Sequence, residues 1–260
     1  MFKKIILLLV LCLFIFCGCG KKQTVIKSDL SKVIERGEII VGVRTDTYPF
    51  GYLDEKGNYA GYDIDIAKLI GKKIFGKDGK VKFVAVTATD RMMKLFSEDI
   101  DIIVATMSVT PSRMEIMDFS TPYYFAGQAL LVKNNSEIKG LRDLDGRIAI
   151  IVFGSTAEKS LRSAVPNVNI VGYKTYDKAA EGLKKGRGDA IVSDNSILLG
   201  LALKDKNLKL LPKKYSKEPY SVAFRKGDES REFVKVVNEI IAEASRTGAL
   251  RKMQKAYGIK

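Results

Sequence analysis

The second half of the chain repeats the order of secondary-structure signals found in the first half. The segment at 145–156 (DGRIAIIVFGST) echoes the segment at 36–45 (RGEIIVGVRT). In the same way 177–194 echoes 90–106, each being a helical pattern that runs into a strand led by aspartate. Because the unit occurs only twice, a solenoid of many stacked repeats is excluded. We therefore expect two similar lobes.

Short β-branched runs alternate with helical patterns along the chain, which is typical of an α/β fold. The elements expected in the first half are strands at 38–43, 81–86 and 101–106 and helices at 63–75 and 90–99. Asp63 and Asp65 fall in the first turn of the longer helix. Negative charge is favourable at a helix N-terminus, so these acids support a helix start at this point.

Two segments at the changeovers between the repeated units, 120–134 and 208–227, are predicted to cross between the lobes. The last helical pattern, 230–258, would then return to the first lobe. The expected division of the chain is a signal peptide at 1–18, a lipidated N-terminus and tether at 19–34, the first lobe at 35–125, the second lobe at 126–214 and a C-terminal part of the first lobe at 215–260.

Polar side chains follow four of the predicted strands. In open α/β sheets, ligands bind beyond the carboxyl ends of the strands. If the two lobes face each other, the four sets can converge on one cleft. The sets are Arg44, Thr45 and Asp46; Thr106 and Ser108; Ser155 and Thr156; and Ser193 and Asp194.

The composition excludes several kinds of site. The chain has no histidine, so a histidine triad, a histidine general base and a histidine-ligated metal are all excluded. Its three cysteines fall within the first nineteen residues, so the rest of the chain has neither disulfide nor thiolate cluster. The net charge is +14, but the lysines are scattered among acids, which favours solvated surfaces over a nucleic-acid site. No metal or cofactor is implied.

The N-terminus has the order of a secretory signal: Lys3 and Lys4, an apolar run at 5–16, then small residues. The run is short for a membrane-spanning helix, which is the alternative. The following CGCG resembles a bacterial lipobox, with Cys19 as the preferred lipidated residue and Cys17 as the alternative. We expect an exported protein anchored by lipid on the outer face of the cytoplasmic membrane, which is the cell surface in a Gram-positive bacterium.

The stretch GYDIDIAKLIGKKI at 61–74 resembles the signature of bacterial extracellular solute-binding proteins of family 3, the amino-acid receptors of ABC importers. Further blocks follow in the order of that family, YPFGYLDEKGNYAGYD, VTPSRMEIMDFSTPYY and GDAIVSDNSIL, and the resemblance runs from about residue 35 to the C-terminus. Within the family, the blocks PFGYLDEKGNYAGYDI and GDAIVSDNSILL resemble those of aspartate- and glutamate-binding members. The resemblance implies a periplasmic-binding-protein type II fold, with two α/β sheet sandwiches joined by two hinge strands. It also implies a monomer that closes around a free amino acid and docks on a membrane permease driven by an ATPase.

The resemblance also implies a clamp for the backbone of an amino acid. Arg113 would hold the α-carboxylate, and Asp194 would receive the α-ammonium. Four residues would share the carboxylate through hydroxyl and backbone groups: Thr106, Ser108, Ser155 and Thr156. The alternatives are a surface arginine in the turn after Pro111, and helix caps at Asp194, Ser155 and Thr156.

Two arginines could read the ligand side chain. Arg91 opens a predicted helix and Arg44 ends the first strand, so together they favour an acidic ligand, glutamate or aspartate. Arg91 could instead pair with Asp90 on a solvated face, and an Arg44–Asp46 ion pair would cancel the second charge. Thr47 and Tyr48 are further candidates for the side-chain pocket.

Other functions stay open on the sequence alone. Some relatives of this fold are prephenate or arogenate dehydratases, which need an acid to protonate a leaving hydroxyl. Apart from Asp194, the chain offers only Asp46 for that role. An adhesin or sensor module would need a fused signalling or surface-anchoring segment, which we do not expect in this chain. Receptors for neutral polar amino acids, glutamine or cystine, are the remaining alternative to an acidic ligand.

Overall fold

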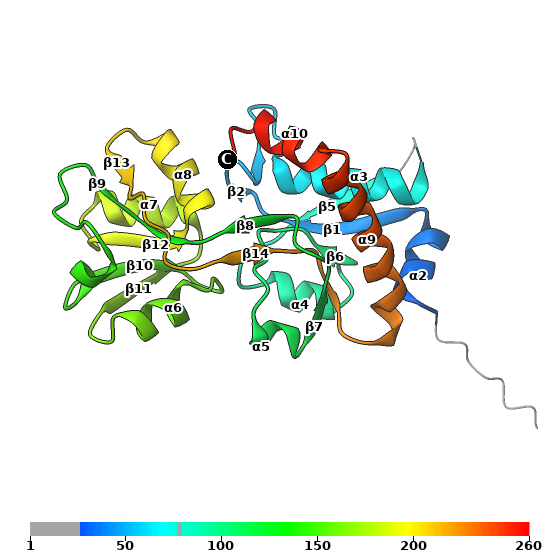
Figure 1. Cartoon of the computed structure of the whole chain (residues 1–260), viewed down its shortest axis with the longest axis horizontal. Helices are drawn as coiled ribbons and strands as arrows, with labels where there is room; N and C mark the ends of the chain where they lie inside the picture. Colours follow the sequence, from blue (N-terminus) through cyan, green and yellow to red (C-terminus); the bar gives the residue numbers. More distant parts are fainter. Residues whose placement is uncertain (1–26, 77–79, 260) are drawn as a thin grey trace, which may run out of the picture.

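Two five-stranded sheets form the centres of two lobes that lie side by side along the molecule (Figure 1). The computed structural model describes residues 27–76 and 80–259. The predicted signal peptide and both candidate lipidation sites, Cys17 and Cys19, lie outside these residues. The expected two-lobed α/β fold is confirmed.

The sheet of lobe 1 is built mainly from the first part of the chain. Its strand order is β5 (Lys80–Ala85), β1 (Glu38–Val43), β6 (Ile102–Ile103), β15 (Ala223–Arg225) and β7 (Met117–Phe119). β1 pairs in parallel with β5 and β6, whereas β15 pairs antiparallel with β6 and β7. The helices of this lobe are α2 (Asp29–Arg36), α3 (Tyr62–Phe75), α4 (Arg91–Phe96), α5 (Pro111–Met114), α9 (Asp228–Arg246) and α10 (Ala249–Ala256), and a small sheet joins β2 (Asp46–Thr47), β3 (Gly51–Leu53) and β4 (Tyr59–Ala60).

The sheet of lobe 2 repeats this plan. Its strand order is β11 (Asn169–Tyr173), β10 (Ile148–Val152), β12 (Ala190–Asp194), β9 (Gln128–Lys133) and β13 (Leu208–Leu210). β10 pairs in parallel with β11 and β12, and β9 pairs antiparallel with β12. The helices are α6 (Ala157–Ala164), α7 (Tyr176–Lys184) and α8 (Asn195–Lys204), with a short 3-10 helix η2 (Leu141–Leu144).

Two short strands run between the lobes, β8 (Tyr124–Ala126) and β14 (Glu218–Tyr220) (Figure 1). They pair antiparallel with each other and lie within the two predicted crossover segments. After β14 the chain returns to lobe 1, where α9 and α10 contribute Phe233, Val237 and Leu250 to the core. The chain thus crosses between the lobes within the two predicted segments and then returns to lobe 1.

Three expectations about single elements need correction. Residues 29–34, predicted as part of the tether, form α2 instead, because Leu30 and Val33 are buried in the lobe 1 core. The helical pattern at 230–258 is two helices, broken at Gly248, whose φ of 74° lies in the left-handed region that favours glycine. The strand predicted at 101–106 is shorter, being β6 at Ile102–Ile103. Within the described ranges, no helix combines the length and the apolar character needed to cross a membrane.

Candidate functional site

A closed cavity lies between the lobes, beyond the carboxyl ends of β1, β6, β10 and β12. Its volume is only about 10 Å³, so little free space remains between the two walls. Most of the polar residues that the sequence placed at the cleft line it; the exceptions are Thr45, Asp46, Thr47, Tyr48 and Ser193. The lining residues are Arg44, Ala88, Arg91, Thr106, Ser108, Arg113, Ser155, Thr156, Tyr176, Asp194 and Ile197.

Arg113 is fixed by the short helix α5. The hydroxyl of Thr110 accepts a hydrogen bond from the amide of Arg113, and Pro111 occupies the first helical position. Arg113 is only 9% exposed, so this is no surface arginine. It donates to the carbonyl of Ser108 at 2.8 Å and, across the cleft, to the carbonyl of Gly154 at 3.0 Å. Both lobes therefore contact this side chain.

Arg91, at the start of α4, is buried beside Arg113. It donates to the carbonyl of Ala105 at 2.6 Å and to that of Gly154 at 3.4 Å, while its Nε has no partner among the described residues. The alternative pairing with Asp90 on a solvated face is wrong, because Asp90 lies near Lys94 instead. Burial, and then the charges of Arg113 and Arg44, lower the pKa of Arg91 to about 9.

The charge of Arg44 is balanced by the neighbouring carboxylate of Asp46. Its guanidinium makes two hydrogen bonds of 2.8 Å to the carboxylate of Asp46, a bidentate geometry. The guanidinium also lies 5.5 Å from the ring centre of Tyr176 in lobe 2, and the amide of Tyr176 donates to Asp46 at 3.2 Å. The ion pair that the sequence left open is thus formed, and it bridges the lobes.

Asp194 ends β12 on the opposite wall. It occupies the N-cap position of α8, but its side chain makes no capping hydrogen bond. Its Oδ1 accepts from the side-chain amide of Gln128 at 2.6 Å, and its Oδ2 accepts from the hydroxyl of Tyr220 at 2.5 Å. Burial raises the pKa of Asp194 to about 7, against the opposing effect of the Tyr220 hydrogen bond. This carboxyl group can therefore change its charge near neutral pH.

Ser155 and Thr156 lead into α6. The Ser155 hydroxyl donates to the carbonyl of Val152 at 2.7 Å. Thr156 is the N-cap residue without a side-chain capping bond, and its hydroxyl accepts from Gln128 at 3.0 Å. Gln128 thus holds both Thr156 and Asp194, although sequence reasoning did not single it out.

The loop after β6 carries Thr106 and Ser108 to the cavity. The amide of Thr106 donates to Asp63 at 2.7 Å, and its hydroxyl donates to the carbonyl of Ala105 at 2.8 Å. Asp63 is a second residue that sequence reasoning did not assign to the site, because its place in the first turn of α3 already explained it. Its signal was the family block at 61–74, which contains it.

Thr47 and Tyr48 do not line the cavity. The Thr47 hydroxyl donates to the carbonyl of Gly51 at 3.3 Å within the small sheet. The ring of Tyr48 packs edge-on against Tyr52 at 5.0 Å. The aromatic wall inside the cavity is provided by Tyr176 of lobe 2 instead.

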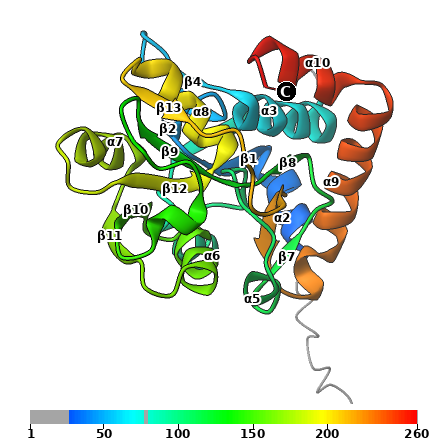
Figure 2. The same cartoon turned by 60° about the vertical axis from the view of Figure 1, so that its left-hand side comes forward.

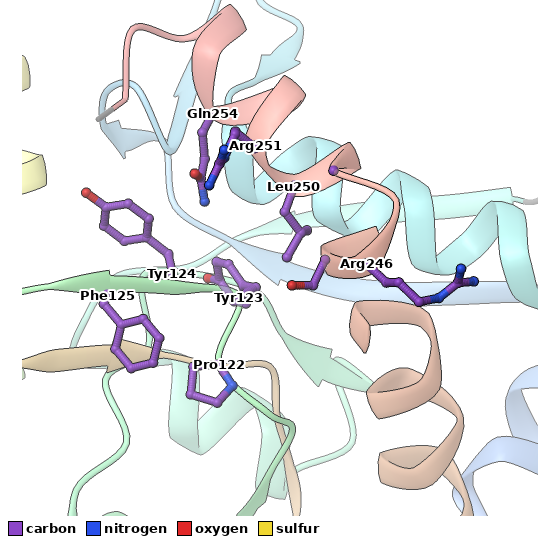
Figure 3. Close-up of a pocket in the computed structure, with 10 residues that line it drawn as sticks. Pro122, Tyr123, Tyr124, Phe125, Arg246, Leu250, Arg251 and Gln254 are labelled. Carbon is purple, nitrogen blue, oxygen red and sulfur yellow. The ribbon is translucent and has the colours of Figure 1, made fainter. Parts of the chain in front are cut away.

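A more open groove lies elsewhere, between the segment that enters β8 and the junction of α9 with α10 (Figure 3). It is lined by Pro122, Tyr123, Tyr124, Phe125, Ser245, Arg246, Gly248, Leu250, Arg251 and Gln254. No carboxylate is among these described residues, so the groove offers nothing to receive an ammonium group. The closed cavity between the lobes is the better candidate site.

Residues 39–260 match the sequence profile of the bacterial extracellular solute-binding proteins, family 3. The chain belongs to this family. It is 36% identical to the ABC transporter glutamine-binding protein GlnH of Bacillus subtilis, over 98% of this chain and 97% of that protein. It is 41% identical to the glutamine-binding protein of Geobacillus stearothermophilus, over 76% of each. Its fold matches the crystal structure of the cysteine-binding protein from Campylobacter jejuni with a TM-score of 0.83 and 32% identity, over 88% of this chain and 92% of that one.

Membership of this family makes the chain an exported solute-binding receptor that binds a free amino acid and delivers it to an ABC permease. It is a receptor and not an enzyme, so the dehydratase alternative is set aside.

Proposed function

We propose that this family member is a glutamine receptor. The observation that carries the proposal is the Arg44–Asp46 pair, which removes one of the two positive charges that favoured an acidic ligand. Three guanidinium groups lie in the cavity wall, and three carboxylates lie in it or are hydrogen-bonded to it. They are Arg44, Arg91 and Arg113, and Asp46, Asp63 and Asp194. Equal numbers of opposite charges suit a ligand without net charge, such as glutamine.

In this proposal the two walls hold opposite ends of the amino acid. Arg113 binds the α-carboxylate with its planar fork, together with Thr106 and Ser108 from lobe 1. Asp194 accepts from the α-ammonium. Ser155 and Thr156 add hydroxyl and backbone groups from the start of α6, and Arg44 and Arg91 face the side-chain amide. The names of the two glutamine-binding relatives support the ligand.

Glutamate is the second candidate. Arg91 contacts no carboxylate among the described residues, and its Nε is buried without an acceptor. A ligand carboxylate would supply that acceptor. We also propose that lipid at Cys19 holds the receptor on the outer face of the cytoplasmic membrane, as the lipobox resemblance implies.

The test is calorimetry on a soluble form that begins at Lys22, stripped of ligand by unfolding and refolding. Glutamine, glutamate, aspartate, cystine, arginine and histidine are titrated in turn. We expect glutamine to bind at least about ten-fold more tightly than glutamate, a difference of ~1.4 kcal/mol. Tighter binding of glutamate than of glutamine would identify glutamate as the ligand. If none of the six amino acids binds, the proposal is refuted.

A charge variant sharpens this test. Asp46→Asn frees the guanidinium of Arg44, so the ratio of glutamate to glutamine affinity should rise by about ten-fold or more. Asp54→Asn, in the exposed turn between β3 and β4, is the matched control and should leave the ratio unchanged. An unchanged ratio in Asp46→Asn would show that Arg44 does not read the side chain.

A further inference from the structure

Thr106 holds a backbone conformation that its residue type disfavours. Its φ is 46°, in the left-handed region, where the crowded Cβ of a β-branched residue makes the conformation costly. Thr106 lines the cavity at the end of β6. Such a conformation persists only where the surroundings determine it. Some contact outside the loop must therefore hold it.

Asp63 supplies that contact from α3. Its side chain is 0% exposed, and its Oδ2 accepts the hydrogen bond of the Thr106 amide at 2.7 Å. Its Oδ1 accepts from the hydroxyl of Tyr123 at 2.9 Å. No lysine or arginine of the described chain forms an ion pair with this carboxylate. Burial raises the pKa of Asp63 to about 6, and these two hydrogen bonds oppose that rise.

The conformation of Thr106 decides which side chains reach the cavity. Ala105 and Met107 are buried in the core behind the loop. Thr106 and Ser108 face the cavity instead, and the carbonyl of Ser108 accepts a hydrogen bond from the guanidinium of Arg113. A change of φ at Thr106 would alter which of these side chains face the cavity. It would also move the Ser108 carbonyl, which orients Arg113. The carboxylate end of the site thus depends on one buried acid.

The same acid is connected to the hinge. Tyr123 directly precedes β8, and its amide donates to the carbonyl of Tyr220 in β14 at 2.9 Å. The hydroxyl of Tyr220 in turn reaches Asp194. Figure 3 shows Tyr123 beside β8, in the wall of the open groove. Hydrogen bonds of Tyr123, next to β8, and of Tyr220, in β14, thus connect Asp63 with Asp194 at the opposite end of the site.

We infer that Asp63 is a positioning residue for ligand binding: it fixes the left-handed conformation of Thr106 and ties the carboxylate loop to the hinge through Tyr123. Asp63 does not touch the ligand in this assignment. The inference rests on the proposed function only in taking an amino acid as the ligand.

The test compares Asp63→Asn with Asp65→Asn. An asparagine can accept one of the two hydrogen bonds but presents an N–H₂ group to the other donor. Asp65 is the matched control, since it lies on the same helix and also accepts a tyrosine hydroxyl, that of Tyr257. We expect Asp63→Asn to weaken glutamine binding by about 10- to 100-fold, the range for a lost hydrogen bond to a charged group. Asp65→Asn should bind like the unaltered protein.

A second readout separates positioning from mere destabilisation. Hydrogen exchange at the Thr106 amide should become much faster in Asp63→Asn and stay slow in Asp65→Asn, with both variants folded at the assay temperature. Undiminished glutamine affinity in Asp63→Asn, or equal losses in both variants, would overturn the inference. If no amino acid binds even the unaltered protein, the proposed function fails. In that case the hydrogen-exchange rate of the Thr106 amide is the only test of the role of Asp63. Slow exchange at this amide in Asp63→Asn would overturn the inference.

Tyr123→Phe covers the case in which Asp63→Asn does not fold. It removes one donor to Asp63 and leaves the Thr106 hydrogen bond in place. We expect a smaller loss of affinity, about three- to ten-fold, in line with one neutral donor lost. Unaltered affinity and unaltered exchange at Thr106 would overturn the link to the hinge.

Discussion

The two walls of the cavity differ in the sign of their charge. Lobe 1 contributes the three arginines, with Asp46 bound to one of them. Lobe 2 contributes one carboxylate, Asp194, together with the hydroxyls of Ser155, Thr156 and Tyr176. An amino acid is a zwitterion, and the proposed binding mode places its carboxylate on lobe 1 and its ammonium on lobe 2. In that mode neither wall alone binds both ends, so we expect affinity to depend on closure.

The walls also differ in how they are held. On lobe 1 the arginines are oriented largely by backbone carbonyls, and the Thr106 loop is fixed by Asp63. On lobe 2 a single side chain, Gln128, binds Thr156 and Asp194 together. Its position at the start of β9, directly after the hinge, means that hinge motion moves both groups at once. Lobe 2 thus presents its half of the site as a unit.

The largest expected loss of ligand affinity comes from removing an arginine from the lobe 1 wall of the cavity. Arg113→Ala should weaken ligand binding by roughly 100-fold or more, because truncating one partner of a buried charged hydrogen-bond pair leaves the other unpaired. The fold should persist in circular dichroism. Calorimetry provides the measurement, and Arg187→Ala, an exposed arginine of lobe 2, is the control. Intact affinity in Arg113→Ala would refute the clamp.

A smaller loss of ligand affinity is expected from a substitution that prevents the two lobes from closing fully. A Cβ at Gly200 of α8 would overlap with the carbonyl oxygen of Tyr48 in lobe 1, and Figure 2 shows lobe 2, with α8, turned toward the viewer. Gly200→Ala should therefore hinder closure and weaken binding by about ten-fold, while alanine favours the helix itself by ~1 kcal/mol. Unliganded melting temperature should hold or rise. X-ray scattering should show less compaction on ligand addition than in the unaltered protein.

Gly182→Ala is the control for that variant. A Cβ at Gly182 would meet the hydroxyl of Tyr173 within lobe 2, so it should lower the melting temperature and spare the affinity. Equal affinity losses in the two variants would mean that the Gly200 effect is not one of closure.

An effect of similar size is expected from the charge of the acidic wall. The pKa of Asp194 is raised to about 7, chiefly by burial, with Glu218 adding to the rise and Tyr220, Arg113 and Arg91 opposing it. A carboxyl group with a raised folded-state pKa binds more protons folded than unfolded, so its contribution to stability falls as pH rises through about 7. Unliganded melting temperature should therefore be higher at pH 5.5 than at pH 8.

Ligand affinity should change in the opposite direction, because the α-ammonium needs an ionised Asp194. We expect about ten-fold weaker binding at pH 6 than at pH 8, the effect of one proton taken up by the free receptor. Asp194→Asn should flatten the pH dependence of the melting temperature. An unchanged slope in this variant would assign the titration to another group, such as Asp63.

The local sequence pattern predicted those helices and strands in which apolar residues recur at regular spacing. The strand at 38–43 is found with its predicted bounds, and α3 begins one residue before its predicted start. The family blocks led to Arg113 and Asp194, both of which line the cavity. The break in the last helix could have been predicted too, because Gly248 interrupts the pattern.

Long-range contacts account for what the sequence did not reveal. Tyr176 and Asp46 meet across 130 positions of chain, so no local pattern contains their hydrogen bond. Asp63 has the same local signal as Asp65, and only the tertiary fold directs one toward Thr106 and the other toward Tyr257. The Arg44–Asp46 pair was visible in the sequence, but its bidentate geometry was not.

The way in which lobe 2 interrupts lobe 1 has a consequence for how the chain matures. Every strand of the lobe 2 sheet lies between Gln128 and Leu210, whereas the lobe 1 sheet receives β15, the strand between β6 and β7, only at Ala223–Arg225. Phe233 and Val237 of α9 then complete its core. For a chain that crosses a membrane N-terminus first, lobe 2 can finish folding while lobe 1 waits for its last segment. We therefore expect lobe 1, although it begins first, to be the last part of the chain to become resistant to proteases.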